Sequence, residues 1–226
     1  MKASCSLWSA DLLALKSAIE ALSGHADEFH LDVMDGNCVP DILFGLDFVA
    51  AIRAVTSTPL DVHLMTRTTA DWIERTVAAG AARLAIHADF CEDVKAALHQ
   101  IEGLGATPVL VLPLEVAIEE RSLPWGFFRR VLLMGTEIGI KGVGLDPRIA
   151  GRIRTLVEFR AKLGVDFEIF VDGGIRSETV PLLAGAGADG VVPGSLVLKA
   201  PDPVEALAWI HSLASGNPVL EEKTPV

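Results

Sequence analysis

Short apolar segments rich in Val, Ile and Leu alternate along this chain with longer segments whose apolar residues recur every three or four positions. The short segments predict buried β-strands and the longer ones predict amphipathic helices. We expect eight strands, at residues 3–8, 28–34, 60–65, 83–88, 107–113, 129–135, 167–174 and 190–198. A helix is expected after each, at residues 9–22 with Ser9 as its N-cap, 48–55, 68–80, 93–105, 116–121, 146–164, 177–187 and 202–214.

The regular alternation of strands and helices indicates a parallel sheet, because each helix carries the chain back to start the next strand in the same direction. Eight such units in about 220 residues favour a single closed (β/α)8 TIM barrel of the α/β class over an open sheet. We expect one barrel domain over residues 1–215 and a polar tail over 216–226. Active-site groups of such barrels gather at the carboxyl ends of the strands.

The composition limits the classes of partner. Half of the 226 residues are hydrophobic, but we find no apolar stretch of about 18 residues without charges or Gly/Pro breaks, so we expect no membrane segment and no signal peptide. A net charge of −11 argues against nucleic-acid binding. Cys5, Cys38 and Cys91 cannot all pair and lack metal-binding spacing, which indicates reduced thiols in a cytoplasmic protein.

Ionisable residues interrupt three of the predicted strands. Side chains alternate along a strand, so two sets each share a side: His30, Asp32 and Met34 in the second strand, and Asp61, His63 and Met65 in the third. Asp172 lies late in the seventh strand. The imidazoles of His30 and His63 and the carboxylates of Asp32 and Asp172 therefore point into one barrel mouth, where Val, Ile and Leu would be usual.

Buried ionisable groups without partners would cost several kcal/mol each, so something must compensate. A divalent cation bound by His30, Asp32, His63 and Asp172 would do so, and this donor set suits Zn²⁺, Mn²⁺, Fe²⁺ or Co²⁺. Taken singly, an inward His is often a hydrogen-bonded core group, and Asp172 before two glycines can be a turn residue. Convergence favours a metal or catalytic site. His87 either supports this site or is a hydrogen-bonded core residue.

Three loops that follow predicted strands are rich in glycine, at residues 135–142, 172–175 and 193–195. Backbone N–H groups at Gly173, Gly174, Gly194 and Ser195 can approach a phosphate closely, and phosphate sites recur after the last two strands of such barrels. Tight barrel turns are an equally good explanation of these glycines.

Several motifs, in order along the chain, resemble those of the ribulose-phosphate 3-epimerase family. FHLDVMDGNCVPD (29–41) is similar to its HxDVMDGxFVPN segment, LDVHLM (60–65) to its DVHLM, and FVDGGI (170–175) to its VDGGI. CSLWSADL (5–12) and PGS (193–195) are similar to its PSILSAD and AGS. Each motif is weak alone, but the combination is specific.

The resemblance implies a (β/α)8 barrel that inverts C3 of ribulose 5-phosphate or a related ketose phosphate. It implies one divalent ion per chain on His30, Asp32, His63 and Asp172, with Asp32 and Asp172 as the acid/base pair. The implied substrate contacts are Ser6, His63, the loop from Gly139 to Gly142, Gly173, Gly174, Gly194 and Ser195. Met34 and Met65 would line the site over the substrate or fill the core.

This chemistry explains the residue types. Inversion removes a proton next to a carbonyl and returns one to the opposite face, so it needs a carboxylate on each face. The ene-diolate formed on the way is negatively charged, and a cation stabilises it. No organic cofactor is called for, since GIKGVG (139–144) lacks the order of a dinucleotide-binding motif.

The predicted sixth-strand loop departs from the family. The family reads M-[ST]-V-x-P-G-F-G-G-Q where this chain has MGTEIGIKGVG (134–144). The four predicted ligands are unchanged, so we expect the chemistry to persist on ribulose 5-phosphate or on a related ketose phosphate. Lys141 either contacts the phosphate with its ammonium or is a solvated surface residue.

Two other functions compete with epimerisation. One is a phosphate-binding barrel of the decarboxylase or lyase type, but such barrels typically carry Asp-x-Lys-x-x-Asp, and LDVMDG (31–36) has no lysine. The other is a sugar-phosphate-binding protein without catalysis. We also expect a homo-oligomer, with Trp125, Phe127 and Phe128 as candidate subunit contacts or as part of the substrate cover.

Overall fold

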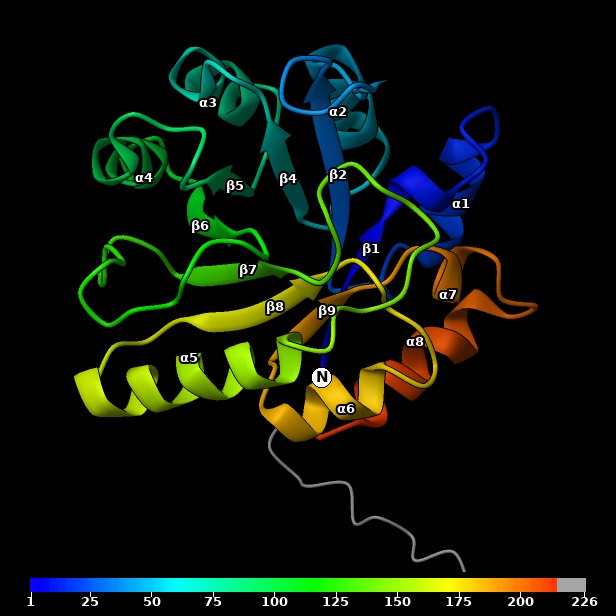
Figure 1. Cartoon of the computed structure of the whole chain (residues 1–226). Helices are drawn as coiled ribbons and strands as arrows, with labels where there is room; N and C mark the ends of the chain where they lie inside the picture. The colour runs from blue at the N-terminus through cyan, green and yellow to red at the C-terminus, as the bar shows by residue number, and fades with distance from the viewer. Residues whose placement is uncertain (215–226) are drawn as a thin grey trace, which may run out of the picture.

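The computed structural model describes residues 1–214, so the predicted tail at 216–226 lies outside the described residues. Within residues 1–214, eight parallel strands form a closed barrel: β1 (Lys2–Ser6), β2 (Glu28–Asp35), β4 (Leu60–Met65), β5 (Arg83–His87), β6 (Thr107–Leu112), β7 (Arg130–Met134), β8 (Glu168–Asp172) and β9 (Gly190–Val192). Pairing of β1 with both β2 and β9 closes the ring (Figure 1). The predicted (β/α)8 barrel is confirmed.

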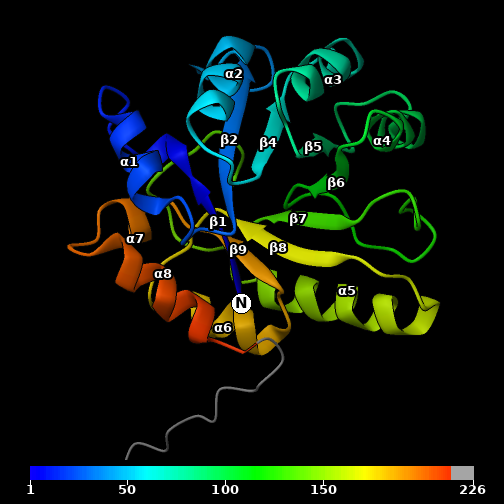
Figure 2. The same ribbon diagram turned by 180° about the vertical axis from the view of Figure 1, so that it is seen from behind.

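Helices surround the barrel, as Figures 1 and 2 show from opposite sides. They are α1 (Leu15–Leu22), α2 (Leu46–Val55), α3 (Thr69–Ala78), α4 (Val94–Gly103), α5 (Ile149–Leu163), α6 (Val180–Ala186), α7 (Ser195–Leu198) and α8 (Pro203–Ser212). In α1, Leu15, Ile19 and Leu22 share the buried face, as the amphipathic pattern requires. A 3-10 turn, η1 (Leu7–Ser9), follows β1, and β3 (Ile42–Leu43) pairs antiparallel with β2.

The two largest differences in element boundaries from the sequence prediction concern the first helix and the last strand. The first helix begins at Leu15 and not at Ser9, because residues 7–9 form η1 and the Ser9 side chain lies against Gly194, where it caps no helix. The last strand ends at Val192, since Pro193 has no N–H to continue the ladder. Gly194 and Ser195, expected on this strand, are the N-cap and the first residue of α7.

The predicted helix at 116–121 is absent from the structure: this segment forms turns between β6 and β7. In Figure 1 it belongs to the green loop that joins β6 to β7 at the left of the view. Arg152 of α5 donates to the carbonyl oxygens of Pro113, Leu114 and Val116 at 2.8–3.0 Å. These carbonyls, in and just before the predicted segment, are therefore bonded to a side chain of another element, which holds the loop in its turn conformation.

Aromatic side chains later in the same loop pack against one another and against neighbouring elements. Trp125 packs against Phe159 and Phe167 with ring centroids 5.8 Å apart in both pairs, and Phe128 is 1% exposed. The expectation that Phe128 is an exposed contact is therefore wrong, whereas Trp125 is half-buried and Phe127 is exposed. The sequence pattern did not predict this, because the packing of Trp125 depends on Phe159 of α5, an element far along the chain.

The strands divide the core into two layers. Side chains that point outward, such as Leu31 and Val33, pack against the helices. Side chains that point inward fill the barrel, including Val109, Leu132 and Phe170. At the amino ends of the strands, Arg130 lies inside the barrel, 3.5 Å above the ring of Phe170.

Arg130 also joins a buried ion network. Its guanidinium donates to both oxygens of Glu28 at 2.7 and 2.8 Å and to Glu168 at 2.7 Å. Hydrogen-bonded partners on two sides make its burial tolerable. This network closes the bottom of the barrel and leaves the opposite end for a site.

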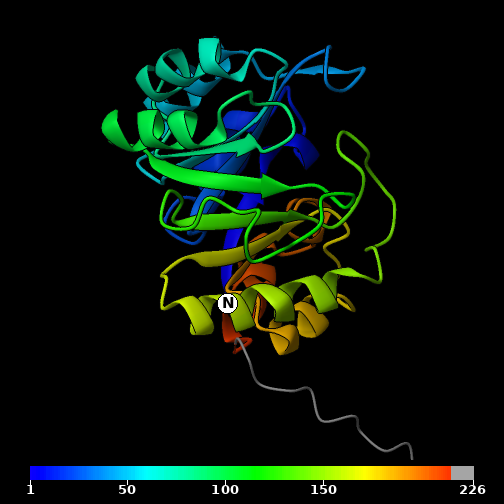
Figure 3. The ribbon, with the colours of Figure 1, turned by 60° about the vertical axis from the view of Figure 1, so that its left-hand side comes forward.

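The carboxyl ends of the strands face a set of loops, of which the one at 135–148 stands out furthest in Figure 3. The arrowheads of β7 and β8 point toward this side. In the described part of the chain, every helix is too short or too polar to cross a bilayer.

Candidate active site and metal centre

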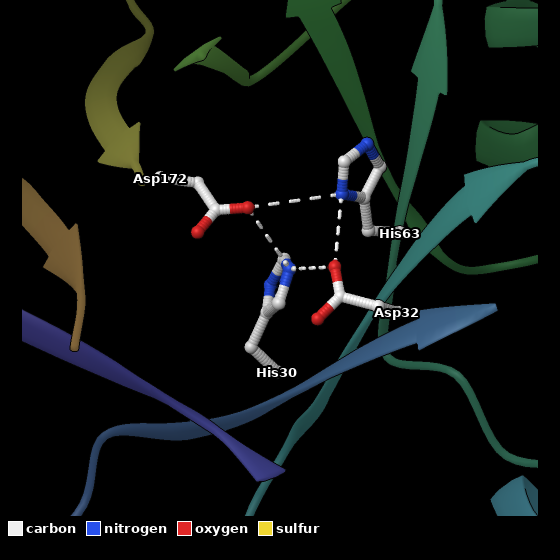
Figure 4. Close-up of side chains that lie close together, drawn as sticks. All are labelled: His30, Asp32, His63 and Asp172. Carbon is white, nitrogen blue, oxygen red and sulfur yellow. Dashed lines mark hydrogen bonds and ion pairs between the residues drawn. The ribbon is translucent and has the colours of Figure 1, made fainter. Parts of the chain in front are cut away.

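Three strands place four ionisable side chains around one point at the carboxyl end of the barrel. His30 and Asp32 come from β2, His63 from β4 and Asp172 from β8, and Figure 4 shows them turned toward one another. Nε2 of His30 lies 3.3 Å from Oδ1 of Asp32 and 3.7 Å from Oδ2 of Asp172. Nδ1 of His63 lies 3.3 Å and 3.9 Å from the same two oxygens.

This cluster fits a divalent cation. One atom from each side chain lies within 4.8 Å of the other three. Ligands at about 2.0–2.2 Å from a cation lie about 3–4 Å from one another, so a small contraction would complete a shell. Nε2 of His30 is buried and has no hydrogen-bond partner among the described residues. A bound cation would give this nitrogen a partner. Whether the four residues are ligands stays a prediction.

Burial and mutual attraction set the charges of the cluster. Burial would lower the pKa of His30, but Asp32 and Asp61 outweigh it and raise the pKa well above its ordinary value. Burial would raise the pKa of Asp32, but His30 and His63 outweigh it and hold the pKa far below its usual range. The cluster therefore contains an ionised Asp32 beside a histidine that tends to be protonated.

Asp172 behaves in the opposite way to Asp32. Burial raises its pKa to about 7, with further repulsion from Asp32 and Asp61, while His30 acts against the rise. Two carboxyl groups in one site thus differ widely in proton affinity. Such a difference lets one be the base while the other is the acid near neutral pH.

Asp61 is a residue that the sequence reasoning placed on the inward side but left out of the site. Its Oδ2 lies 2.9 Å from Nδ1 of His30 and accepts a hydrogen bond from Ser4 at 3.1 Å. Asp61 and His30 are register partners on adjacent strands. A carboxylate with inward parity beside a candidate ligand was the available signal.

His87 lies on the far side of His63 from the carboxylates. Its Nε2 is 2.7 Å from Nε2 of His63, and its side chain is completely buried. Burial lowers its pKa to about 4, with a contribution from His63, while Asp89 acts against the change. His87 is therefore a neutral imidazole that is hydrogen-bonded to a candidate ligand.

A cavity of about 540 Å³ opens above the cluster. Most of the residues predicted to contact substrate line it: Ser6, Gly139, Lys141, Gly142, Gly173, Gly174, Gly194 and Ser195, together with Asp32, Asp172 and Met65. His63 and Met34, which were also predicted to contact or line the site, do not line this cavity, and Met34 packs with Val39 and Met65. Trp8, Thr136, Arg176 and Lys199 also line it and were missed.

The loop after β7 covers this cavity and is tied down on two sides. Nζ of Lys141 donates to the carbonyl of Trp8 at 2.6 Å and lies 4.0 Å from the centre of its ring. Arg176 donates to the carbonyls of Gly142 and Val143 at 3.2 and 3.3 Å. Two cations therefore stand at the rim of the cavity in a chain whose net charge is −11.

Gly173 and Gly174 are required by the turn that follows β8. Both have positive φ, of 94° and 71°. A Cβ on Gly173 would lie 2.4 Å from Oγ1 of Thr136, and one on Gly174 would lie 2.6 Å from the backbone of Leu145. These glycines let the backbone after Asp172 lie close to the loop after β7.

Comparison with known sequences gives one consistent result. The model of the ribulose-phosphate 3 epimerase family matches residues 2–198. A ribulose-phosphate 3-epimerase of Treponema pallidum is 37% identical over 191 residues, which cover 84% of this chain and 88% of the relative. One of Bacillus subtilis is 34% identical over 213 residues, covering 93% and 98%.

Two solved structures with the same architecture are more distant in sequence. A crystal structure of KGPDC from Streptococcus mutans has a TM-score of 0.70 at 15% identity, covering 92% of this chain and 94% of the other. Orotidine 5′-phosphate decarboxylase from Pyrococcus horikoshii has a TM-score of 0.64 at 17% identity, covering 92% and 97%. At these identities the likeness establishes the barrel fold alone.

Proposed function

Because the chain belongs to the ribulose-phosphate 3-epimerase family, we propose that it inverts C3 of ribulose 5-phosphate or a related ketose phosphate. One observation carries this proposal: two carboxylates of opposite proton affinity and two imidazoles meet at the floor of a cavity large enough for a small sugar phosphate. The prediction of the family from sequence motifs is confirmed.

Asp32 and Asp172 are the proposed acid/base pair. They come from β2 and β8, which are separated in the barrel by β1 and β9, so they approach a substrate from different sides. Asp32, which is ionised in the ion-free site, takes the C3 proton on one face, and Asp172, whose pKa without the ion is about 7, delivers a proton to the other. In the reverse direction the two exchange roles.

His30, Asp32, His63 and Asp172 are the proposed ligands of one divalent ion, Zn²⁺, Mn²⁺, Fe²⁺ or Co²⁺. The unpartnered Nε2 of His30 and the mixed N/O donor set support this assignment. When bound, the ion would stabilise the negative charge that develops on the substrate oxygens. The protein itself positions the two carboxylates at the cavity.

The phosphate end of the substrate is proposed to lie among the glycine-rich loops. Ser6, Gly173, Gly174, Gly194 and Ser195 line this part of the cavity. Lys141 and Lys199, which also line it, add positive charge that glycine amides alone do not provide. Their presence supports binding of an anion despite the acidic balance of the chain.

The competing functions have less support. A decarboxylase or lyase of this fold would be expected to carry a lysine on β2, and β2 has none. A sugar-phosphate-binding protein without catalysis would have no need of two buried carboxylates with opposed proton affinities.

Isotope exchange tests the proposal directly. The metal-replete protein is incubated in D₂O with tetrulose, pentulose and hexulose phosphates, and with their unphosphorylated forms as controls. We expect deuterium at C3 of at least one phosphorylated ketose, together with its C3 epimer. Exchange with none of them would refute the epimerase assignment.

We also propose a cytoplasmic location and a homo-oligomeric state. The three cysteines are free thiols, which suits a reducing compartment. Leu12, Leu13, Ile42 and Phe48 are exposed apolar residues around α1, β3 and α2, and a second copy would bury them. Sedimentation equilibrium of the unaltered protein and of Leu13→Asp tests the second proposal.

A further inference from the structure

His63 and His87 share a hydrogen bond inside the barrel wall. Nε2 of His63 lies 2.7 Å from Nε2 of His87. The ring planes differ by 17° and the ring centroids are 4.9 Å apart. For two nitrogens 2.7 Å apart, ring centroids 4.9 Å apart are almost as far from each other as they can be. Both nitrogens therefore lie between the two ring centres. The rings therefore meet edge to edge, which is the geometry of a well-aligned N–H···N bond.

Such a bond needs one nitrogen that carries a proton and one that does not. Figure 4 shows the other nitrogen of His63, Nδ1, turned toward the two carboxylates. If Nδ1 ligates a cation it carries no proton, so the proton of a neutral His63 is on Nε2. The acceptor is then Nε2 of His87, and the proton of His87 is on Nδ1.

We propose that His87 is a positioning residue for the metal centre: by accepting the hydrogen bond from Nε2 of His63, it leaves Nδ1 of His63 unprotonated and directed at the cation. This inference rests on the proposed function, because it assigns a role relative to the proposed ion. It concerns a residue outside the proposed ligand set.

Asp89 extends this pair to a chain of three polar residues, His63, His87 and Asp89, which we call the relay. Nδ1 of His87 lies 3.5 Å from Oδ1 of Asp89, whose side chain is 40% exposed, and the described residues offer Nδ1 no closer hydrogen-bond partner. A contact of this length at the surface is weaker than the buried 2.7 Å bond. Asp89 therefore supports the tautomer of His87 less strongly than His87 supports that of His63.

The hydrogen bond between His63 and His87 can be donated by either residue, and a bound cation determines which residue is the donor. Without the cation, a proton on Nδ1 of His63 donates to Asp32 at 3.3 Å, and His87 becomes the donor to His63. With the cation bound, His63 donates to His87, and the proton of His87 lies on Nδ1, the nitrogen nearer to Asp89. The tautomer of His87 therefore changes when the centre is loaded, although His87 touches no proposed ligand except His63.

Nitrogen NMR of the histidines in the full chain tests this on the unaltered protein. The ¹⁵N shifts of His87 are recorded during a titration with Zn²⁺ alone. We expect protonation of Nδ1 and an unprotonated Nε2 in the Zn²⁺-loaded protein. A Zn²⁺-loaded protein in which Nε2 of His87 carries the proton would overturn the inference.

Variants provide the second measurement, the Zn²⁺ affinity by competition with a chelator. His87→Leu removes the acceptor and is expected to weaken Zn²⁺ binding by about 10–100-fold. His87→Gln places an amide oxygen near the position of Nε2 and should restore most of the affinity. Phe90→Leu is the matched control, because Phe90 packs on His87 with ring centroids 4.7 Å apart but offers it no acceptor.

Asp89→Ala is expected to weaken Zn²⁺ binding by a smaller factor, about threefold to tenfold. Glu92→Ala, which removes a nearby exposed acid, controls for the change of charge. Equal affinities for His87→Leu, His87→Gln and the unaltered protein would overturn the inference. Epimerase activity measured in the same samples separates this failure from a failure of the proposed function, since an active enzyme indifferent to His87 refutes only the relay.

Discussion

Nδ1 of His30 lies 2.9 Å from Oδ2 of Asp61, and both side chains are buried beneath the candidate metal centre. This contact directs the other ring nitrogen, Nε2, toward Asp32 and Asp172. Asp61 itself lies 3.7 Å from Nη1 of Arg130. The ion network at the bottom of the barrel therefore extends to the floor of the site.

Asp61→Asn should weaken Zn²⁺ binding by about 10–100-fold, because a neutral amide holds the His30 ring less firmly than a carboxylate. Chelator competition measures the affinity. Glu28→Gln is the matched control, since Glu28 bonds to Arg130 and does not touch His30. It should lower the free energy of unfolding and leave the affinity unchanged. Equal losses of affinity in both variants would assign Asp61 a merely structural role.

Replacing one carboxylate should separate proton exchange from inversion. Asp172→Asn keeps Asp32, so it should still exchange the C3 proton on one face of the substrate while epimerisation falls by about 10²–10⁴-fold. Asp32→Asn should show the reverse preference between the two epimers. Metal content is measured in each sample, because both residues are also proposed ligands. Identical exchange behaviour of the two variants would contradict one acid/base group per face.

Much of the fold and part of the site follow from local pattern. Period-two alternation placed His30, Asp32 and His63 on the inward face, and closure of the barrel brings β8 near them. The loss of the helix at 116–121 did not follow, because it depends on Arg152, a residue of another element that bonds to the carbonyls at and just before this segment.

Contacts between distant elements also determine parts of the site that the sequence pattern does not predict. Arg176 and Lys199 reach the cavity from loops whose conformation depends on distant contacts, such as that of Arg176 with the carbonyl of Gly142. The contact of His87 with His63 depends on the stagger between β4 and β5, which alternation alone does not determine. Sequence reasoning therefore finds inward groups but not their partners.

Metal affinity should depend steeply on pH. Burial raises the pKa of Asp172 to about 7, and Asp32 and Asp61 raise the pKa of His30 against the effect of burial. Both groups must lose a proton to bind a cation, so protons compete below about pH 7. We expect the apparent affinity for Zn²⁺ to fall by at least about tenfold per pH unit in that range. Calorimetry in buffers of different ionisation enthalpy should also detect proton release. Equal affinities at about pH 6 and about pH 8 would contradict this.

The ion network at the bottom of the barrel should stabilise the fold except in acid. Burial alone would raise the pKa of Glu168, but Arg130 and Lys2 outweigh it and lower the pKa below its ordinary value. A depressed folded-state pKa contributes stability above the unfolded value, about 4.3, and loses it as pH falls through the folded value. Glu168→Gln should therefore lower the free energy of unfolding by about 1–3 kcal/mol at about pH 7 and by much less near pH 3. Urea unfolding at both pH values measures the difference, and a constant difference would contradict the assignment.

Lys141 should affect substrate binding more than turnover. Its ammonium now bonds to the Trp8 carbonyl at the rim of the cavity, where a phosphate would be a stronger acceptor. Lys141→Met keeps most of the length of the side chain and removes the charge, so KM for the phosphorylated ketose should rise about tenfold while kcat changes little. Lys16→Met, on the exposed face of α1, controls for the change in net charge. An unphosphorylated ketose should show no difference between Lys141→Met and the unaltered protein. An unchanged KM for the phosphorylated substrate would leave Lys141 as a residue that only ties the loop to Trp8.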